Sequence, residues 1–544
     1  MKKMKKMRSV VVCALAMAVM LAGCAKKESG AASAGGGGGS SSAASAGKAV
    51  AITVEVFDRG SDGGKSDPTN NNWTKWIQEK LLRDENIAVT FIPISRWDET
   101  SATINLMAAG TAPDLCYTYN NDMVNRFGMQ GGVYDLTPYV ETHLQDLKEF
   151  MGADPQMPGK ELIWRNINSD NGQLYSISNK YVYTATQNLF IRKDWLDKLG
   201  LPLPKTAEEY FDALTAFKTQ DPGGVGANRV IPFTLTVDVR WAAGVIINSF
   251  MDPYISRKEL WVNSIVDRSA LVPGFKEGLR YMNRMYNAGL IDKDFPLYKS
   301  EDTMNGLIKS GVVGSIAGNW DQVYRENVAL MSDMQKNVPG ALFVAVDCFP
   351  SADGLTHKRG ASPAGGLSFF IPKTTSQEKA EAALRYANWL ARYENYHFLQ
   401  FGNEGVNHTL VDGLPKVIST TGGWIQNSGG NIDYTLSING YAMETEELTV
   451  RVLANSYPWP EEYIMDAYRI SSNNAIPSPI VPVTLYVAGP LTQTLTDKSQ
   501  VFYVQSIIAK TEDFDRVWDN GVKDWLVSGA QEVLNERMEK YIEP

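Results

Sequence analysis

Two short apolar stretches, AITVEVF at residues 51–57 and AVTFIP at residues 88–93, decide the fold class of this chain. Both have the length and the β-branched content of strands that are buried in a sheet. Apolar residues at helical spacing follow each stretch: Trp73, Ile77 and Leu81 after the first, and Ala102, Leu106 and Ala109, closed by Gly110, after the second. A third strand begins at PDLCY, residues 113–117. Strands that alternate with helices predict a parallel α/β sheet, in which ligands bind beyond the carboxyl ends of the strands.

The same alternation continues along the rest of the chain. Capping boxes of the form Thr-x-x-Glu are predicted to open helices at residues 206–209 and 375–378. Apolar stripes at helical spacing run through residues 275–286 and 517–526, and a strand is predicted at 367–371. No internal repeat of fixed period is present, which argues against a solenoid or a propeller.

Length and composition limit the possible classes of protein. With 544 residues the chain is long enough for two or three domains, because one core rarely serves more than about 250–300 residues. Its 44% hydrophobic and 21% charged residues are typical of a globular protein. The 61 acidic side chains exceed the 52 basic ones, and the net charge of −9 argues against nucleic acid as a partner. Four cysteines and four histidines leave little material for a disulfide framework or a multi-histidine metal centre.

The first residues have the pattern of an export signal. Basic side chains at residues 2–8 precede an apolar run at 10–20 that is too short to span a bilayer, which needs about 20 residues. The sequence LAGC at 21–24 follows and resembles the bacterial lipobox. This resemblance implies a lipoprotein signal peptide over residues 1–23 and a lipid attached to Cys24, which becomes the first residue of the mature protein. The alternative is an ordinary signal peptide with an incidental cysteine.

Residues 24–49 form the predicted link between the lipid and the body of the protein. After Cys24 the segment consists almost wholly of Ala, Gly, Ser and Lys, a composition typical of a flexible coil. About 24 such residues reach roughly 25–30 Å. We therefore expect a protein anchored by lipid to the extracytoplasmic side of the cell membrane, whether or not the host has an outer membrane. Two further cysteines, Cys116 and Cys348, have two alternatives: they form a disulfide with each other, or they remain as separate buried thiols.

Motifs for catalysis or cofactor binding are incomplete in this sequence. GSDGGKS at 60–66 follows a strand but has Arg59 in place of the first glycine of a phosphate-binding loop, and Asp67-Pro68 interrupts the helix that such a loop needs. GASPA at 360–364 lacks the last glycine of a nucleophile elbow. The chain contains no HExxH and no CxxC. We therefore predict no catalytic residue, no cofactor and no metal.

Several segments, taken in order along the chain, resemble one known family. They are LMAAGTAPDL at 106–115, GVYDLTPY at 132–139, IRKDWLDKLGL at 191–201 with PKT at 204–206, YNAGLI at 286–291, GVVGSIAGNW at 311–320 and FGNEGV at 401–406. Together they are similar to the family 1 extracellular solute-binding proteins of ABC importers, the group that includes maltose-binding protein. The resemblance covers nearly all of residues 50–544. Two departures are the loop at 221–229, which has too few oxygen ligands for calcium, and His408, which replaces a tyrosine common in related chains.

The resemblance implies an α/β protein with the two-lobed fold of type II periplasmic binding proteins and a ligand cleft between the lobes. Lobe 1 is expected at residues 50–175 with a return at 359–420, and lobe 2 at 176–358 with the C-terminal residues 421–544. Such a protein captures a sugar or oligosaccharide and delivers it to the permease subunits of an ABC importer as a monomer, without altering it chemically. A receptor for a peptide or another solute, a surface enzyme acting on glycosides and a tethered adhesin are the alternatives.

Candidate ligand-binding residues are chosen for chemistry and for position in this expected fold. Sugars are held by flat aromatic rings and by planar polar groups in a largely buried cleft. The resemblance places Trp320 and its neighbour Asp321 at the end of a strand that delivers a stacking aromatic. The other candidates follow predicted strands or face the expected cleft: Phe57, Asp58, Arg59, Trp97, Tyr119, Asn120, Asp122, Arg240, Trp241 and Glu404. Trp73, Trp76 and Trp195 are assigned to the core instead.

Overall fold

The computed structural model describes residues 48–60, 67–226, 228–265, 269–326, 328–360, 364–418 and 421–543. The expected signal peptide, Cys24 and nearly all of the predicted tether lie outside the described residues. The same holds for residues 61–66 of the glycine-rich loop and for Ser362 of the GASPA segment.

The elements near the start of the chain form the first lobe, which we define by the strands and helices packed around Ile52, Val54 and Trp73. Its strands are β1 (Val50–Asp58), β2 (Ile87–Ser95), β3 (Cys116–Thr118), β4 (Ile177–Tyr181), β10 (Ala364–Phe370) and β13 (Ile438–Asn439), with a separate hairpin of β11 (His408–Val411) and β12 (Leu414–Val417). Its helices are α1 (Asn72–Glu85), α2 (Glu99–Ala109), α3 (Asn121–Met129), α4 (Val140–His143), α5 (Gln145–Met151), α14 (Gln377–Leu390), α15 (Tyr393–Phe401) and α16 (Ile432–Thr435).

The sheet of the first lobe is mixed rather than parallel. β1 and β2 pair in parallel, and backbone hydrogen bonds between Leu115 and the β1 residues Thr53 and Glu55 bring β3 beside β1. β10, however, runs antiparallel to both β3 and β4. The alternation of strands and helices predicted parallel pairing, which holds for β1 with β2 and for the short β13 with β4 but not for β10. β10 reverses the direction because the chain re-enters this lobe after the whole of β5 to β9, which no local pattern records.

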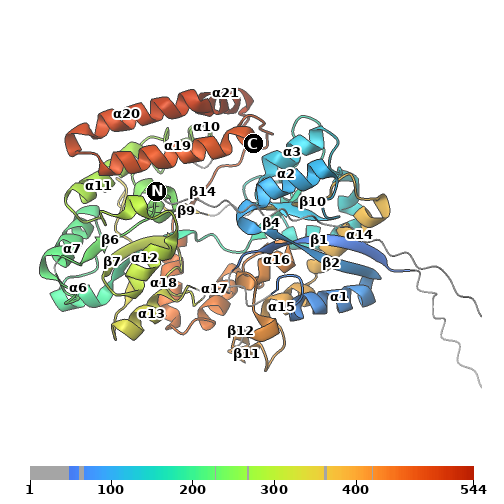
Figure 1. Ribbon diagram of the computed structural model, residues 1–544, viewed down its shortest axis with the longest axis horizontal. Helices are drawn as coiled ribbons and strands as arrows, with labels where there is room; N and C mark the ends of the chain where they lie inside the picture. Colours follow the sequence, from blue (N-terminus) through green and yellow to red (C-terminus); the bar gives the residue numbers. More distant parts are fainter. Residues whose placement is uncertain are drawn as a thin grey trace, which may run out of the picture. The chain divides into compact units, whose positions relative to one another are not determined.

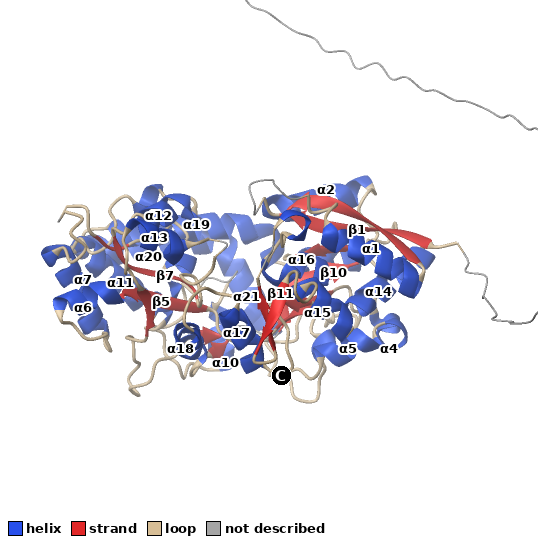
Figure 2. Ribbon diagram, turned by 90° about the horizontal axis from the view of Figure 1, so that it is seen from below, coloured by secondary structure: helices blue, strands red, loops and turns tan. Residues whose placement is uncertain are grey.

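A second sheet forms the centre of the second lobe, defined by the elements packed around Leu189, Phe190 and Ile316. Its strands are β5 (Gln187–Arg192), β6 (Ile231–Phe233), β7 (Val313–Asn319) and β8 (Phe343–Val346), in the order β6-β7-β5-β8. Its helices are α6 (Lys193–Leu199), α7 (Ala207–Gln220), α8 (Val239–Ala242), α9 (Gly244–Asn248), α10 (Arg257–Asn263), α11 (Phe275–Asn287), α12 (Glu301–Lys309), α13 (Leu330–Asn337), α17 (Glu446–Asn455), α18 (Glu461–Ser472), α19 (Ala488–Ile508), α20 (Phe514–Trp525) and α21 (Gln531–Lys540). Helices surround the strands in both lobes (Figure 2).

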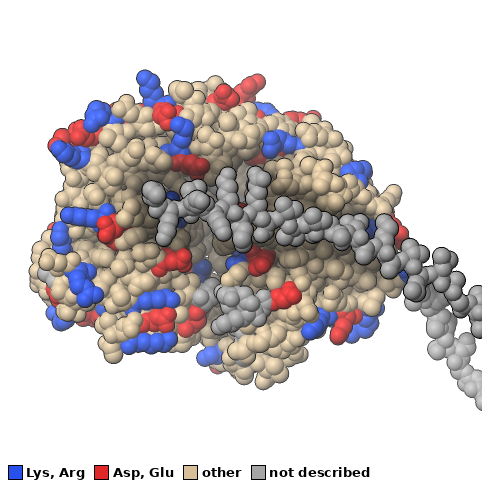
Figure 3. Space-filling view, viewed as in Figure 1, with Lys and Arg blue, Asp and Glu red and all other residues tan. Residues whose placement is uncertain are grey.

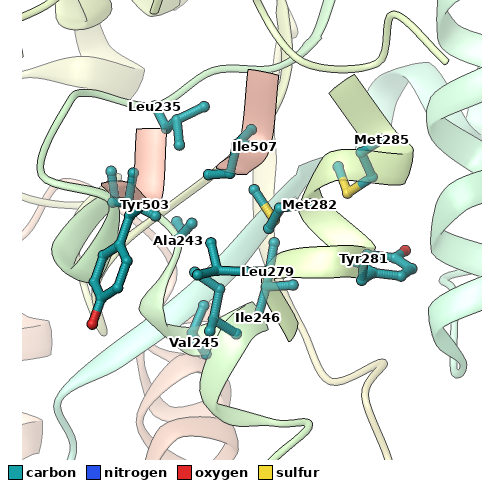
Figure 4. Close-up of a cluster of buried hydrophobic side chains, with 14 of the residues drawn as sticks. Leu235, Ala243, Val245, Ile246, Leu279, Tyr281, Met282, Met285, Tyr503 and Ile507 are labelled. Atoms are coloured by element: carbon teal, nitrogen blue, oxygen red, sulfur yellow. The ribbon is translucent and has the colours of Figure 1, made fainter. Parts of the chain in front are cut away.

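The C-terminal helices are part of the second lobe's core. Tyr503 and Ile507 of α19 lie with Leu279 and Met282 of α11 in one apolar cluster (Figure 4). The buried amide of Asn283 on α11 donates to the carbonyl oxygens of Ser506, Ile507 and Ala509 at 3.0, 2.9 and 2.7 Å, which satisfies groups that a helix end leaves unpaired. On this packing we propose that the C-terminal helices α19, α20 and α21 belong to the second lobe.

The predicted starts of two helices are only partly correct. Thr206 caps α7, since its side chain accepts from the backbone N–H of Glu209 at 3.1 Å, but the carboxylate of Glu209 accepts from the N–H of Lys205 and not from that of Thr206. The second box is wrong. α14 has Ser376 and not Thr375 as its N-cap, and no side-chain cap bond is formed; Thr375 belongs to the preceding turn, where its N–H donates to the carbonyl of Pro372 at 3.1 Å.

The chain crosses between the lobes at several places. One crossing follows β4, and another is β9 (Arg359–Gly360), which pairs in parallel with β14 (Ile476–Pro477) (Figure 1). β4 shares a sheet with β10, and Tyr434 and Leu436 are buried in the first lobe's core. We therefore propose crossover points after Tyr181 and near residue 440, later than the boundaries at 175 and 420 that the sequence suggested.

Cys116 and Cys348 do not pair with each other. Cys116 is buried in the first lobe and Cys348 in the second, and both are free thiols. Burial raises the pKa of each thiol, so neither is a reactive thiolate. Among the described helices, none has both the length and the apolar character needed to span a membrane.

Candidate functional site

A cavity of about 1480 Å³ lies between the two lobes and is lined by side chains of both. This volume exceeds the roughly 300–1,000 Å³ typical of sites for small ligands, so the cavity has room for more than one sugar unit. We call its two sides the first-lobe wall and the second-lobe wall. The first-lobe wall includes Glu99, Tyr119, Asn120, Asn121, Asp122, Asn166, Ser178 and Ser368, and the second-lobe wall includes Gln187, Arg240, Trp241, Asn248, Trp320, Asp321, Arg325, Glu326 and Arg359.

Tyr119 is a half-buried aromatic ring on the first-lobe wall. It directly follows β3 and stacks against Phe57, with ring centroids 6.2 Å apart. The guanidinium of Arg96 lies 4.0 Å from the centroid of the Tyr119 ring. Glu99 fixes the backbone here, since its carboxylate accepts from the Thr118 hydroxyl at 2.7 Å and from the Tyr119 N–H at 3.2 Å. The ring is therefore held on a rigid support with part of its surface still accessible.

Beside Tyr119, a neutral polar network covers the first-lobe wall. The side-chain amide of Asn166 donates to the hydroxyls of Ser176, Ser178 and Ser368 at 3.0, 2.9 and 3.1 Å. The Ser176 hydroxyl in turn donates to the side-chain amide oxygen of Asn121. These groups satisfy one another while lining the cavity, which leaves hydroxyl and amide groups in fixed places for hydrogen bonds to a solute.

Trp320 is almost completely buried, whereas its predicted role of stacking on a sugar needs an accessible ring face. It follows β7, and only 1% of its surface is exposed, because it packs among Phe190, Ile316 and other core residues of the second lobe. Its ring meets Tyr183 and Tyr468 edge-on, with centroid distances of 5.9 and 5.8 Å. Trp320 thus borders the cavity and supports it at the same time.

Asp321 is buried next to Trp320 and is already neutralised. Its carboxylate accepts from Nε of Arg325 at 2.7 Å and from the hydroxyl of Tyr457 at 2.6 Å. Burial, together with the negative charge of Asp321, raises the pKa of the Tyr457 hydroxyl, which therefore stays a proton donor. The three groups form one bonded unit at the second-lobe wall.

Arg240 and Trp241 reach the second-lobe wall from α8. The Gln187 side chain, at the start of β5, donates to the backbone carbonyl of Trp241 at 2.9 Å. This bond ties α8 to the central sheet, so that an aromatic ring, an amide and a guanidinium lie on one rigid surface.

The structure brings together seven of the predicted ligand-binding residues and leaves five outside the cavity lining. Those that line it are Tyr119, Asn120, Asp122, Arg240, Trp241, Trp320 and Asp321. Phe57 is fully buried, and its ring supports Tyr119. Arg59 forms a bidentate ion pair with Asp433, with both distances at 2.8 Å.

The other predicted residues outside the lining are on the surface. Trp97 is 75% exposed. Asp58 is exposed and accepts from the N–H of Gly60, and Glu404 is exposed in the turn before β11. His408, noted as a departure from the family, is buried with Nδ1 3.0 Å from the carbonyl oxygen of Phe401, and it does not line the cavity.

Sequence reasoning missed several residues of the cavity. Asn166, Ser178 and Ser368 come from three distant segments and carry no local signal, since isolated Asn and Ser are common in loops and strands. Gln187 and Arg359 lie where the chain crosses between lobes. A search of the predicted crossing segments for polar side chains could have found these two.

Comparison with known families agrees with this architecture. The family model described as bacterial extracellular solute-binding protein matches residues 66–396. This chain belongs to that family. Within the family it is similar to the lipoprotein LipO of Bacillus subtilis, at 23% identity over 84% of this chain and 86% of LipO. It is also similar to the polygalacturonan/rhamnogalacturonan-binding protein YtcQ of the same organism, at 22% identity over 89% of this chain and 94% of YtcQ.

A solved structure shows the fold of this solute-binding protein. The substrate-binding protein FusA of a Streptococcus pneumoniae ABC transporter, in complex with kestose, superimposes with a TM-score of 0.63. The match covers 90% of this chain and 98% of FusA at 15% identity. The chain therefore has the two-lobed fold of the periplasmic solute-binding proteins.

Proposed function

We propose that this protein captures an oligosaccharide in the cleft between its lobes and delivers it to the permease subunits of an ABC importer. It acts as a monomer and performs no chemistry on the solute. The observation that carries the proposal is the large cavity between the lobes, which has rigid aromatic rings and fixed amide and hydroxyl groups on its walls. Tyr119 and Trp241 supply rings from opposite lobes, and Asn166 and Gln187 hold the polar groups in place.

Relatives with sugar ligands support this assignment. FusA is named as a fructooligosaccharide ABC transporter substrate-binding protein, and YtcQ as a polygalacturonan/rhamnogalacturonan-binding protein. The crossing segments around β9 and β14 link the two lobes, and closure about them would couple capture to docking on the permease.

Attachment to the membrane through Cys24 is the second part of the proposal. A lipid on Cys24 would hold the protein on the extracytoplasmic face of the cell membrane, within reach of a permease. The relative LipO is named a lipoprotein, which supports this anchor. Two or three acyl chains anchor a protein stably, whereas a single chain binds reversibly.

Thermal unfolding with a panel of mono- and oligosaccharides, polyols and peptides tests the proposal. A ligand present at 100 times its Kd adds about 2.7 kcal/mol of stability, which is a large shift in Tm. We expect an oligosaccharide to raise Tm and to be recovered intact, as checked by mass spectrometry. Tyr119→Ala should reduce the shift, and Tyr254→Ala, whose ring is 72% exposed and outside the cavity lining, should leave it unchanged.

Other outcomes would replace the proposal with one of its alternatives. Consumption of a sugar would indicate an enzyme that acts on glycosides. A shift caused by a peptide and by none of the sugars would keep the fold and change the solute class. Absence of any shift, with binding to intact cell surfaces instead, would favour an adhesin.

A further inference from the structure

Two arginines on the second-lobe wall have no counter-ion among the described residues. Nε of Arg240 and Nη1 of Arg359 are buried and make no hydrogen bond within the described part of the chain. The contact found for the Arg359 guanidinium is a long one, 3.9 Å from Nη2 to the sulfur of Met251. Both side chains line the cavity.

Buried Nε atoms without a hydrogen bond also occur in Arg96, Arg126 and Arg257, which do not line the cavity, whereas four other arginines of the described chain are paired. Each of these four binds a carboxylate: Arg59 binds Asp433, Arg165 binds Asp154, Arg192 binds Asp194 and Arg325 binds Asp321. A buried cation without such a partner is unfavourable, because desolvation costs free energy that no ion pair offsets. Burial accordingly lowers the pKa of Arg359 to about 10, although the group stays charged at neutral pH.

Glu99, Asp122, Asp321 and Glu326 also line the cavity, but none of these carboxylates forms an ion pair with Arg240 or Arg359, and that of Glu326 accepts from the Ser332 hydroxyl at 2.6 Å. Glu99 accepts from the hydroxyl of Thr118 and the N–H of Tyr119 on the opposite wall, and Asp321 is bound to Arg325 and Tyr457. On the outer face visible in Figure 3, acidic and basic side chains are interspersed. The cavity therefore holds two guanidinium groups, those of Arg240 and Arg359, that form no ion pair within the described part of the chain.

Hydrogen bonds connect the surroundings of the two arginines. The hydroxyl of Thr186 donates to the backbone carbonyl of Arg359. The next residue, Gln187, donates to the carbonyl of Trp241, which follows Arg240 in the chain. Both guanidinium groups thus project from segments that are tied to the start of β5, and the ring of Trp241 and the amide of Gln187 lie with them.

We infer that the solute is an acidic oligosaccharide and that Arg359, assisted by Arg240, binds the carboxylate of one of its uronate units. This inference rests on the proposed capture of an oligosaccharide and names the class of that sugar. A guanidinium matches a carboxylate in a bidentate geometry, and the ion pair is strong where water is excluded. The aromatic ring and amide beside the arginines suit the apolar face and the hydroxyls of the same sugar unit.

Isothermal titration with matched charged and uncharged ligands tests the inference. The probes are trimers of galacturonate, mannuronate and glucuronate, each compared with its methyl ester, which has the same skeleton and no charge. Neutral trimers of glucose, galactose and fructose complete the set. We expect at least one uronate trimer to bind the wild-type protein with a Kd at least about tenfold lower than its ester, consistent with a desolvated ion pair.

Substitutions then assign the preference to the named residues. Arg359→Gln should make the Kd values of the acid and the ester equal within about twofold, whereas Arg359→Lys, which keeps the charge but not the bidentate geometry, should retain part of the difference. Arg240→Gln should reduce the difference by a smaller factor. Arg516→Gln is the matched control, because Arg516 is an exposed arginine outside the cavity lining and should change nothing.

The possible outcomes separate this inference from the proposed function. If neutral trimers or esters bind as tightly as the acids, the protein still captures sugars and the inference is overturned. If the acid is preferred but Arg359→Gln, shown to be folded by its Tm, keeps the full preference, the assignment to Arg359 is overturned. If no saccharide binds at all, the proposed function fails together with it.

Discussion

On the first-lobe wall of the cleft, the amide of Asn166 donates to Ser176, Ser178 and Ser368, whereas on the second-lobe wall Nη1 of Arg359 has no hydrogen-bond acceptor among the described residues. The first arrangement is complete without a ligand, and the second becomes complete only when an anion enters. The difference indicates that the first lobe supplies a pre-organised surface and the second lobe supplies charge. Removing the amide of Asn166 should therefore lower the free energy of unfolding, whereas removing the charge of Arg359 should raise it.

The largest expected effect is on the second-lobe wall, at Trp320. Trp320→Ala removes a side chain that is 1% exposed and should lower the free energy of unfolding by about 3–5 kcal/mol. Tyr119→Ala, on the first-lobe wall, removes a half-buried ring and should cost less than about 2 kcal/mol. Urea unfolding of both variants measures the difference. Equal costs would show that Trp320 is not part of the second lobe's core.

The next largest loss of stability is expected at Asp321, whose carboxylate is paired with Arg325 on the second-lobe wall. Asp321→Ala leaves the guanidinium of Arg325 without its carboxylate and should cost about 2–4 kcal/mol, somewhat less than for a fully buried pair because the Arg325 side chain is 26% exposed. The control is Asp466→Ala, which breaks an exposed pair with Arg469 and should cost under about 1 kcal/mol. If both variants unfold at the same urea concentration, burial of the Asp321 pair does not matter.

A smaller effect is expected for the neutral network of the first-lobe wall. Asn166→Ala leaves the hydroxyls of Ser178 and Ser368 without their shared donor and should cost about 1–2 kcal/mol. Asn535→Ala, in an exposed pair with Gln531, is the matched control and should change stability by less than about 0.5 kcal/mol. A neutral result for Asn166→Ala would indicate that water replaces the amide and that this wall is not pre-organised.

The smallest expected effect is at Arg359 and has the opposite sign, because this substitution should make the protein more stable. Arg359→Gln removes a buried charge that has no partner and should raise the free energy of unfolding of the ligand-free protein by about 1 kcal/mol. Urea unfolding without ligand, beside Arg516→Gln as the control, measures it. A loss of stability would show that the Arg359 guanidinium already has favourable partners in the ligand-free protein and does not need an anionic ligand.

Phe57 and Arg59 lie at the end of the first strand as predicted, but neither side chain lines the cavity. Phe57 and Arg59 were placed in the cleft because they end β1, and the end of that strand does face the region of the cavity through Tyr119. Their side chains are nevertheless used inside the lobe, because Asp433, far away in the chain, binds Arg59. Position on a strand could be predicted, whereas the partner of each side chain could not.

The α/β class, the elements β1, α1 and β2, and the family could be predicted from the sequence, because strand and helix periodicity and the order of motifs are local properties of the chain. Only the tertiary structure decided that β10 runs antiparallel to its neighbours, that Trp320 is core as well as wall, and that Arg359 lacks a counter-ion while Arg325 has one. Such features depend on which distant segments meet when the lobes form, and pairing over hundreds of residues leaves no periodic trace in a single sequence.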